Sequence, residues 1–201
     1  MAVVLLVALS GLFWFRYYTR DLPDIGSLAA YAPAATAQLT DRCLKPSVAI
    51  PYELIGDRLA LALETTERRM PLQISRTMFC TPSKQLTREI AELRAASLIE
   101  RRFSQREILA IYANRVQLGE NLTGVEAASQ YFFHKNPNDL DLAEAAMLAA
   151  LFQSPSLYSP LKHPDRALNR RNEIIDAMAA NRSIPKDDAE AAKAERLLSL
   201  K

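Results

Sequence analysis

The chain has 201 residues, of which 49% are hydrophobic, and its formal net charge is only +2 with both signs interspersed. For this length we expect one sizeable core with an N-terminal segment and no second catalytic domain within these residues. The near-neutral balance lacks the basic surface of nucleic-acid-binding proteins, so we expect no nucleic acid as a partner.

The N-terminus carries an uncharged apolar run from Ala2 to Phe15, which ends in an aromatic and basic collar between Trp14 and Arg20. The run is shorter than the roughly 20 residues that span a bilayer as a helix. A cleaved signal peptide would place basic residues before the run and a small-residue cleavage site after it, and the sequence has neither. We therefore expect residues 1–20 to form a membrane anchor.

Residues 21–47 are rich in Pro and Ala and show no apolar periodicity, which predicts an extended linker. Residues 48–201 predict one helical domain, because apolar positions recur at helical spacing and no useful stretch alternates with period two. The fold class is therefore all-α. A first helix is expected around Leu54 to Leu63, and another along Leu86 to Ser97.

Local boundary signals predict the later helices. Ser104 and Glu107 have the spacing of a capping box, so a helix should follow them. Asp141 and Glu144 repeat this device before the run Ala145 to Leu151, which is apolar on all sides and should be buried at the centre of the core. Prolines that suit a first helical turn begin the last two predicted helices, Pro164 and Pro185.

The cysteines and histidines do not predict a metal site. Cys43 and Cys80, like His134 and His163, lack metal-ligand spacing, so we expect no metal bound by protein ligands. A disulfide between the two cysteines is conceivable outside the cytoplasm, but two small buried or free thiols are the favoured interpretation.

Five segments between Leu86 and Met178 form an ordered series: LTREIAE, FSQREILAIYANRVQLG, GVEAASQYFFHK, DLDLAEAAMLAALFQSPSLYSP and HPDRALNRRNEII. Together they resemble glycosyltransferase family 51, the membrane-anchored enzymes that polymerise lipid II into peptidoglycan glycan strands. The resemblance implies a lysozyme-like helical transglycosylase domain, held at the inner (cytoplasmic) membrane by a single-pass anchor and lying on its periplasmic side. It further implies lipid II, the growing glycan strand, the membrane and other cell-wall synthases as partners. A divalent cation, Mg or Mn, would be bound only through the substrate diphosphate.

Such a reaction needs a carboxylate that accepts the proton of a sugar hydroxyl and cations that hold the departing diphosphate. Lys84, Arg88 and Glu92 recur every four residues and should therefore share one exposed helix face. On its own, such a row is typical of a solvated, salt-bridged surface. The resemblance matches Arg88 and Glu92 to the family's RKxxE motif, with Glu89 in place of its Lys. It implies that Glu92 is catalytic and that Lys84 and Arg88 bind substrate.

Five further positions match motifs of the resembled family, which implies that they bind substrate: Gln73 in STITQQ, Asn114 in ILExYLN, Lys135 in GVEAAxxYFGK, and Arg170 with Arg171 in a late basic pair. From the residues alone, Asn114 is better explained as a helix C-terminal residue and the arginine pair as surface charge. His134 stands where the family usually has Gly, which is unfavourable if the backbone there needs a positive φ.

The family's EDxxFxxHxG motif, which supplies the catalytic base, is truncated in this chain. The passage from it to STITQQ has shrunk to ALETTERRMPLQIS, residues 62–75, which we interpret as a join across a deletion within Glu67 to Met70. The deletion would remove the small lobe that covers the acceptor. Glu67 is the candidate base and Glu64 the second, although each is better explained from the residues alone as a carboxylate on a helix surface.

Three functions are consistent with this pattern. The first is a peptidoglycan glycosyltransferase with reduced activity. The second is a non-catalytic lipid II binder or partner of cell-wall synthases, and the third is a plain helical interaction module. A carboxylate that reaches the acceptor would favour the enzyme, and retained cations without such a carboxylate would favour the binder.

Overall fold

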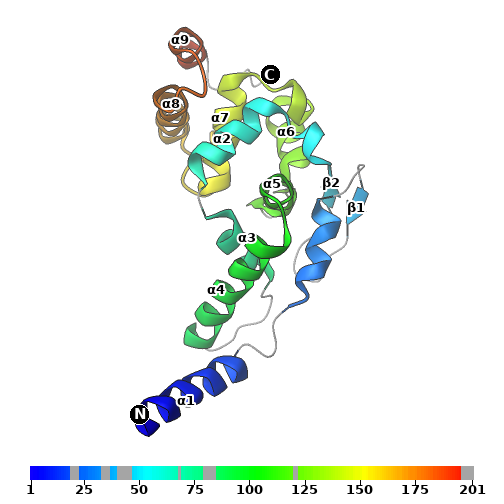
Figure 1. Cartoon of the computed structure of the whole chain (residues 1–201). Helices are drawn as coiled ribbons and strands as arrows, with labels where there is room; N and C mark the ends of the chain where they lie inside the picture. The colour runs from blue at the N-terminus through cyan, green and yellow to red at the C-terminus, as the bar shows by residue number, and fades with distance from the viewer. Residues whose placement is uncertain are drawn as a thin grey trace.

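A computed structural model of the chain describes residues 1–18, 23–32, 37–39, 47–67, 69–78, 85–119 and 122–195. Within these ranges the chain is mostly helical, as expected (Figure 1). The α-helices are α1 (Ala2–Tyr18), α2 (Asp57–Thr66), α3 (Met70–Met78), α4 (Gln85–Arg102), α5 (Gln105–Arg115), α6 (Val125–Phe133), α7 (Leu142–Gln153), α8 (Pro164–Ala180) and α9 (Lys186–Ala194). Short 3-10 helices are η1 (Ile25–Tyr31), η2 (Tyr52–Leu54) and η3 (Pro137–Asp139).

Two short antiparallel strand pairs add to the helices and refine the all-α expectation. Strand β1 (Ala37–Leu39) pairs with β2 (Ser47–Ala49), and β3 (Gln117–Gly119) pairs with β4 (Leu122–Thr123). The second pair directly follows α5, so it fixes the path of the chain from α5 into α6. These strands are too short to form a layer of their own.

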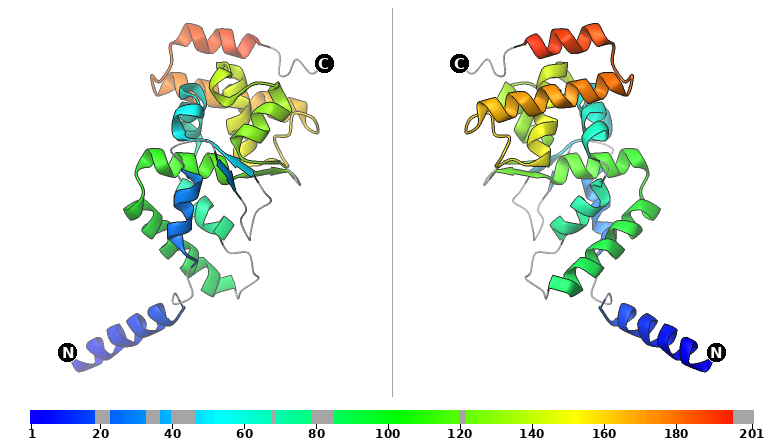
Figure 2. Two further views of the ribbon diagram at one scale, coloured as in Figure 1. Left: turned by 90° about the vertical axis from the view of Figure 1, so that its right-hand side faces the viewer. Right: turned by 90° about the vertical axis from the view of Figure 1, so that its left-hand side faces the viewer.

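Helix α7 forms the centre of the core, as its sequence predicted. Every residue from Ala145 to Phe152 is buried, and α2, α6, α8 and α9 all pack against this helix. The predicted capping box is present, since Glu144 N–H donates to Asp141 Oδ1 at 2.8 Å and Asp141 N–H donates to Glu144 Oε2 at 3.0 Å. Figure 2 shows α8 and α9 at the end of the molecule opposite to α1.

A second group of helices joins this core from below in Figure 1. Helix α3 packs along α4 and also contacts α5, and α5 begins at the predicted capping box of Ser104 and Glu107. Met70, Ile74 and Met78 are the buried positions by which α3 joins the core. The turn that contains Glu67 connects α2 to α3, so the predicted join lies where the two groups of helices meet.

Part of the predicted linker is packed into the domain, which corrects the expectation of an extended segment for residues 21–47. Residues 25–31 form η1, whose Ile25, Leu28 and Tyr31 belong to the hydrophobic core. Asp24 caps η1 by accepting a hydrogen bond from Gly26 N–H at 2.8 Å. The three core residues recur every third position, which is the period of a 3-10 helix, whereas the sequence patterns sought were those of longer α-helices and of strands.

Helix α1 carries the predicted anchor segment. Its described side chains, from Val4 to Arg16, are exposed, and it touches the domain where the Arg94 guanidinium lies 5.2 Å from the ring centroid of Phe15. It has 17 residues. Within the described ranges, no helix combines the length and the apolar character that crossing a bilayer requires.

His134 ends α6 in a left-handed conformation, with φ 54 and ψ 33. In this conformation a residue with a side chain costs the folded state roughly 1–2 kcal/mol, and glycine avoids that cost. Glycine also gives the unfolded chain more conformational freedom, which offsets part of the gain in stability. We expect His134→Gly to raise the free energy of unfolding by about 0.5–1 kcal/mol in urea titrations. The matched variant His163→Gly, where φ is −138, should show no gain. Equal or lower stability of His134→Gly would contradict this assignment of strain.

Candidate active site

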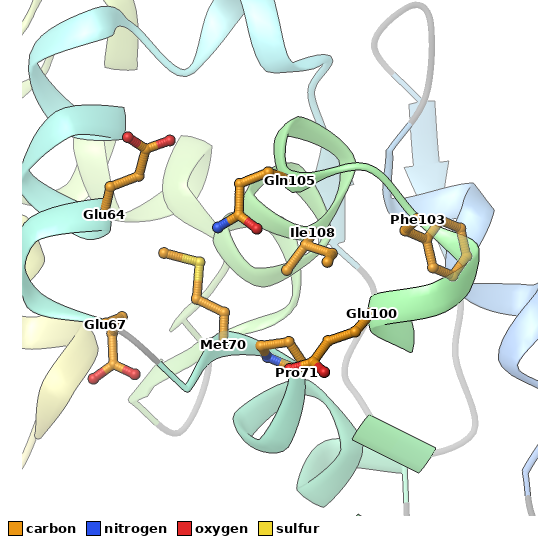
Figure 3. A pocket seen from close by; sticks show the side chains of 8 residues that line it. All are labelled: Glu64, Glu67, Met70, Pro71, Glu100, Phe103, Gln105 and Ile108. Atoms are coloured by element: carbon orange, nitrogen blue, oxygen red, sulfur yellow. The ribbon is translucent and has the colours of Figure 1, made fainter. Parts of the chain in front are cut away.

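A cavity of about 410 Å³ opens at the predicted join, between the end of α2, the start of α3, the end of α4 and the start of α5 (Figure 3). Its apolar walls come from Met70, Pro71, Phe103 and Ile108, and its polar lining from Glu64, Glu67, Glu100 and Gln105. Both residues predicted as candidate bases therefore line one space. The cavity contains no basic side chain among its lining residues, so it does not suit a diphosphate.

Glu67 occupies the C-cap of α2, where its N–H donates to Leu63 O at 2.8 Å. It is half-buried, and this burial raises the pKa of the Glu67 carboxyl above its ordinary value of 4.5. Glu64, one turn earlier on α2, is exposed. In Figure 3 the two side chains stand on the same side of the cavity and their carboxylates point away from each other. The pair thus offers one half-buried carboxylate shifted toward the protonated form and one exposed carboxylate.

Glu92 lies inside a cluster of charged side chains between α3 and α4. Arg88 Nε is 2.7 Å from Glu92 Oε1, and Arg76 Nε is 3.5 Å from Glu92 Oε2. Glu92 is only 7% exposed, which corrects the expectation that it lies on an exposed helix face. It is buried because α3 packs along α4 at this point. Lys84, the third residue of the predicted row, lies outside the described residues.

Arg76 was not predicted from the sequence as a site residue. Its side chain is 53% exposed and that of Arg88 is 36% exposed, so two guanidinium groups held by one buried carboxylate face solvent. Among the described residues, Glu92 is the only ion-pair partner of either arginine. The sequence offered one indication that Arg76 belongs to the site, since it lies three residues after Gln73 on the same helix. Only the packing of α3 on α4 brings this arginine to Glu92.

Helix α3 connects the carboxylate cavity to the arginine pair. Met70 lines the cavity and Arg76 follows six residues later, a separation of roughly 9 Å along the helix axis. Gln73 lies between them and lines a second cavity of about 200 Å³. The carboxylate cavity, the Gln73 amide and the Arg76 guanidinium therefore follow one another along α3, and α4 supplies Arg88 beside Arg76.

The second cavity is rich in amides. Gln73, Gln117 and Gln153 line it together with Tyr112 and Arg115. The guanidinium of Arg115 is buried and donates to Thr77, from Nε to Oγ1 at 2.7 Å and from Nη2 to the carbonyl oxygen at 3.0 Å. Burial, with a smaller contribution from the charge of Glu67, raises the pKa of Tyr112.

The two arginines of the predicted late basic pair have different environments. Arg170 Nε donates to Gln153 Oε1 at 2.7 Å, and Gln153 Nε2 donates to Thr66 O at 3.3 Å, so Arg170 is tied to the end of α2 beside Glu67. Arg171 is completely buried. Its Nη1 and Nη2 each donate at 3.0 Å to a carbonyl oxygen at the end of α9. Burial lowers the pKa of Arg171. Only Arg170 lies near the two cavities.

Lys135 and Asn114 lie outside both cavities. Lys135 Nζ is 2.7 Å from both carboxylate oxygens of Glu144 and 3.7 Å from Asp141, and the hydrogen bond to Glu144 raises the pKa of the lysine.

Asn114 is completely buried. Its Oδ1 accepts a hydrogen bond from Ile50 N–H at 3.1 Å, and its Nδ2 donates at 2.8 Å to the carbonyl oxygens of Tyr31 and Ile50. Asn114 therefore holds η1 and β2 against α5. To contact substrate, as predicted, its side chain would have to give up these three hydrogen bonds.

Side chains that commonly bind metals do not cluster among the described residues. Among them, no group of three or more His, Cys, Asp or Glu side chains could hold one. The exposed charged groups beside Glu92 are guanidinium groups, which have no lone pair for a metal.

Comparison with known proteins places the matched region over these elements. The family model described as Transglycosylase matches residues 70–179, beginning at the C-terminal side of the predicted join. Penicillin-binding protein 1A of Aquifex aeolicus is 43% identical over 106 residues, which cover 53% of this chain and 15% of that protein. The Neisseria flavescens protein of the same name is 34% identical over 144 residues, covering 72% of this chain and 18% of that protein.

The solved structure of penicillin-binding protein 1A from Haemophilus influenzae is similar, with a TM-score of 0.51 and 28% sequence identity. The similarity covers 72% of this chain and 17% of that chain. The chain thus spans less than a fifth of the length of the relatives that it matches.

Proposed function

This chain belongs to the transglycosylase family, and from that premise we propose that it binds lipid II and transfers its disaccharide to a growing glycan strand. The observation that carries the proposal is the pair of exposed arginines, Arg76 and Arg88, held by the buried Glu92. The leaving group of this reaction is a lipid diphosphate, and guanidinium groups bind phosphate oxygens through paired hydrogen bonds.

In the proposed donor site Glu92 acts as a positioning residue. It engages the Nε atom of each arginine, whereas a guanidinium has five N–H donors. The remaining donors are available to the diphosphate. Because the carboxylate fixes both side chains before substrate arrives, less side-chain entropy is lost on binding. Any divalent cation would be held by the diphosphate itself and would neutralise part of its charge.

The proposed acceptor site is the cavity at the join. There the hydroxyl of the acceptor sugar gives its proton to a carboxylate, Glu67 or Glu64, while its oxygen bonds to the anomeric carbon of the donor. The bond from that carbon to the diphosphate breaks, and the bonding electrons leave with the diphosphate at Arg76 and Arg88. The cavity and the arginine pair both border α3, so this helix would lie beside the reacting sugars.

Replacing Arg76 by glutamine tests the donor site. This variant keeps the 2.7 Å pair of Arg88 and Glu92, so the fold should be retained. Loss of one charge-assisted phosphate contact, worth roughly 1.5–3 kcal/mol, should weaken binding of lipid II about tenfold or more. We would measure this by titration of the full chain in a non-ionic detergent.

The control is Arg166→Gln, which removes an exposed charge from α8 and should leave the affinity unchanged. The charge reversal Arg88→Glu should weaken binding at least as much as Arg76→Gln. If both arginine variants bound lipid II as tightly as the parent chain, this surface would be ordinary solvated surface and not the donor site.

A non-catalytic lipid II binder is the second candidate. The surroundings of the Glu92 and Glu67 carboxylates favour it. Glu92 is held in ion pairs, and no described residue donates a hydrogen bond to the Glu67 carboxylate. A base without partners is poorly oriented toward an acceptor. In this form the chain would present lipid II to other cell-wall synthases. The turnover experiment described in the Discussion separates the two candidates.

We also propose that the domain lies on the periplasmic side of the inner membrane, with α1 in the bilayer. The support is the apolar composition of α1 and the exposure of its described side chains. We expect the full-length chain to fractionate with membranes and to need detergent for extraction. Recovery of intact chain in the soluble fraction would refute this location.

A further inference from the structure

A third cavity, of about 490 Å³, lies where the start of η1 faces the C-terminal half of α4. Residues 23–26 form one side, and Leu98, Arg101 and Arg102 form the other. None of these residues belongs to the candidate active site. The lining combines apolar side chains with two guanidinium groups, which is the chemistry of a site for an amphipathic anion.

The charges of this cavity favour an anion. Arg101 and Arg102 are exposed, and neither forms an ion pair or hydrogen bond with a residue in the described part of the chain. The only carboxylate in the lining, Asp24, accepts a hydrogen bond from Gly26 N–H at 2.8 Å and thereby caps η1. A Cβ at Gly26 would lie 3.4 Å from Arg102 Nη2, so glycine keeps the space beside that guanidinium open.

The cavity lies on the same face of α4 that receives α1. Arg94, Leu98, Arg101 and Arg102 follow the spacing i, i+4, i+7, i+8 and therefore share one side of the helix. Arg94 contacts Phe15 of α1, and Leu98 is 36% exposed. From the α1 contact to Arg101 the distance is roughly 10 Å along the helix axis. The polar layer of one leaflet is about 5–8 Å thick, so the backbone of Arg101 lies a few ångströms beyond it, a gap that an arginine side chain can span to a headgroup.

We propose that this cavity binds the headgroup phosphate of an anionic phospholipid, with Arg101 and Arg102 as the phosphate contacts. Leu98 and Ile25 contact the glycerol and upper acyl region, and the chains lie beside the exposed apolar side chains of α1. The proposal uses the membrane location of α1 but is independent of lipid II binding and of turnover. Its consequence is a fixed orientation of the domain on an anionic membrane surface.

The test follows the backbone amide of Gly26, which is easily resolved by NMR because the chain has only 5 glycines. The full chain in a non-ionic detergent is titrated with dihexanoyl phosphatidylglycerol, dihexanoyl phosphatidylcholine or inorganic phosphate. We expect a saturable shift of the Gly26 resonance with phosphatidylglycerol alone. The double variant Arg101→Gln with Arg102→Gln should weaken this binding about thirtyfold.

The matched control removes two exposed charges elsewhere, by Arg166→Gln with Lys186→Gln on α8 and α9, and should bind as the parent does. An equal Gly26 shift with phosphatidylcholine, or undiminished binding by the Arg101 and Arg102 variant, would overturn the proposal. Equal affinity for inorganic phosphate would identify a free-anion site in place of a lipid site. Because Arg76→Gln reports lipid II binding separately, failure here leaves the proposed function intact.

Discussion

Purified protein incubated with labelled lipid II should polymerise glycan about a hundredfold to ten-thousandfold more slowly than a transglycosylase with an intact Glu-Asp motif. That range is the typical contribution of general-base catalysis, which requires the base to lie within hydrogen-bond reach of the acceptor hydroxyl. Glu67 ends α2 at the join, and no described residue donates a hydrogen bond to its carboxylate. Products resolved by length would give the rate.

The residual rate should depend on pH in a defined direction. Burial raises the pKa of Glu67 above 4.5, and a base acts only when deprotonated. The rate should therefore increase as the pH rises through this elevated pKa. Glu67→Gln should remove this dependence, whereas Glu100→Gln, at the opposite wall of the same cavity, should retain it.

Two outcomes would contradict this account of turnover. Polymer formed at an ordinary enzymatic rate and abolished by Glu67→Gln would show that the base is properly held despite the join. Polymer abolished by Glu92→Gln alone would mean that the base is the ion-paired carboxylate between Arg76 and Arg88. The absence of any polymer, with lipid II binding retained, would instead support the non-catalytic binder.

Replacing Asn114 by leucine should lower the free energy of unfolding by about 4 kcal/mol, because it removes three buried hydrogen bonds at once. The backbone groups left without partners are the N–H and carbonyl of Ile50 and the carbonyl of Tyr31. Each unsatisfied buried group costs roughly 1–3 kcal/mol. Leucine has a similar volume, so a cavity contributes little to this loss. Urea titration followed by circular dichroism would measure the change.

The control for Asn114 is Asn169→Leu, an exposed position on α8, which should change stability by no more than about 0.5 kcal/mol. A similarly small effect at Asn114 would show that the three backbone groups find water or other partners. It would also restore substrate binding as the simpler explanation of that side chain.

The sequence alone determined the helical class, several helix starts and the family. The capping boxes at Ser104 and Asp141 were predicted correctly because their hydrogen bonds join residues three positions apart. The buried α7 was predicted because an all-apolar helix has no face for water. The family followed from the order of motifs, which is a property of the chain and needs no coordinates.

Only the tertiary structure decided which residues meet. Asn114 bonds Ile50 across 64 positions and Tyr31 across 83, and Arg76 reaches Glu92 only because α3 packs along α4. Whether Glu92 is exposed, and whether η1 is part of the core, depends on the same packing. Local spacing predicts which side of a helix a residue occupies. Burial and long-range partners depend on which other elements pack against that side. The hydrophobic effect is non-directional, so local spacing does not specify those elements.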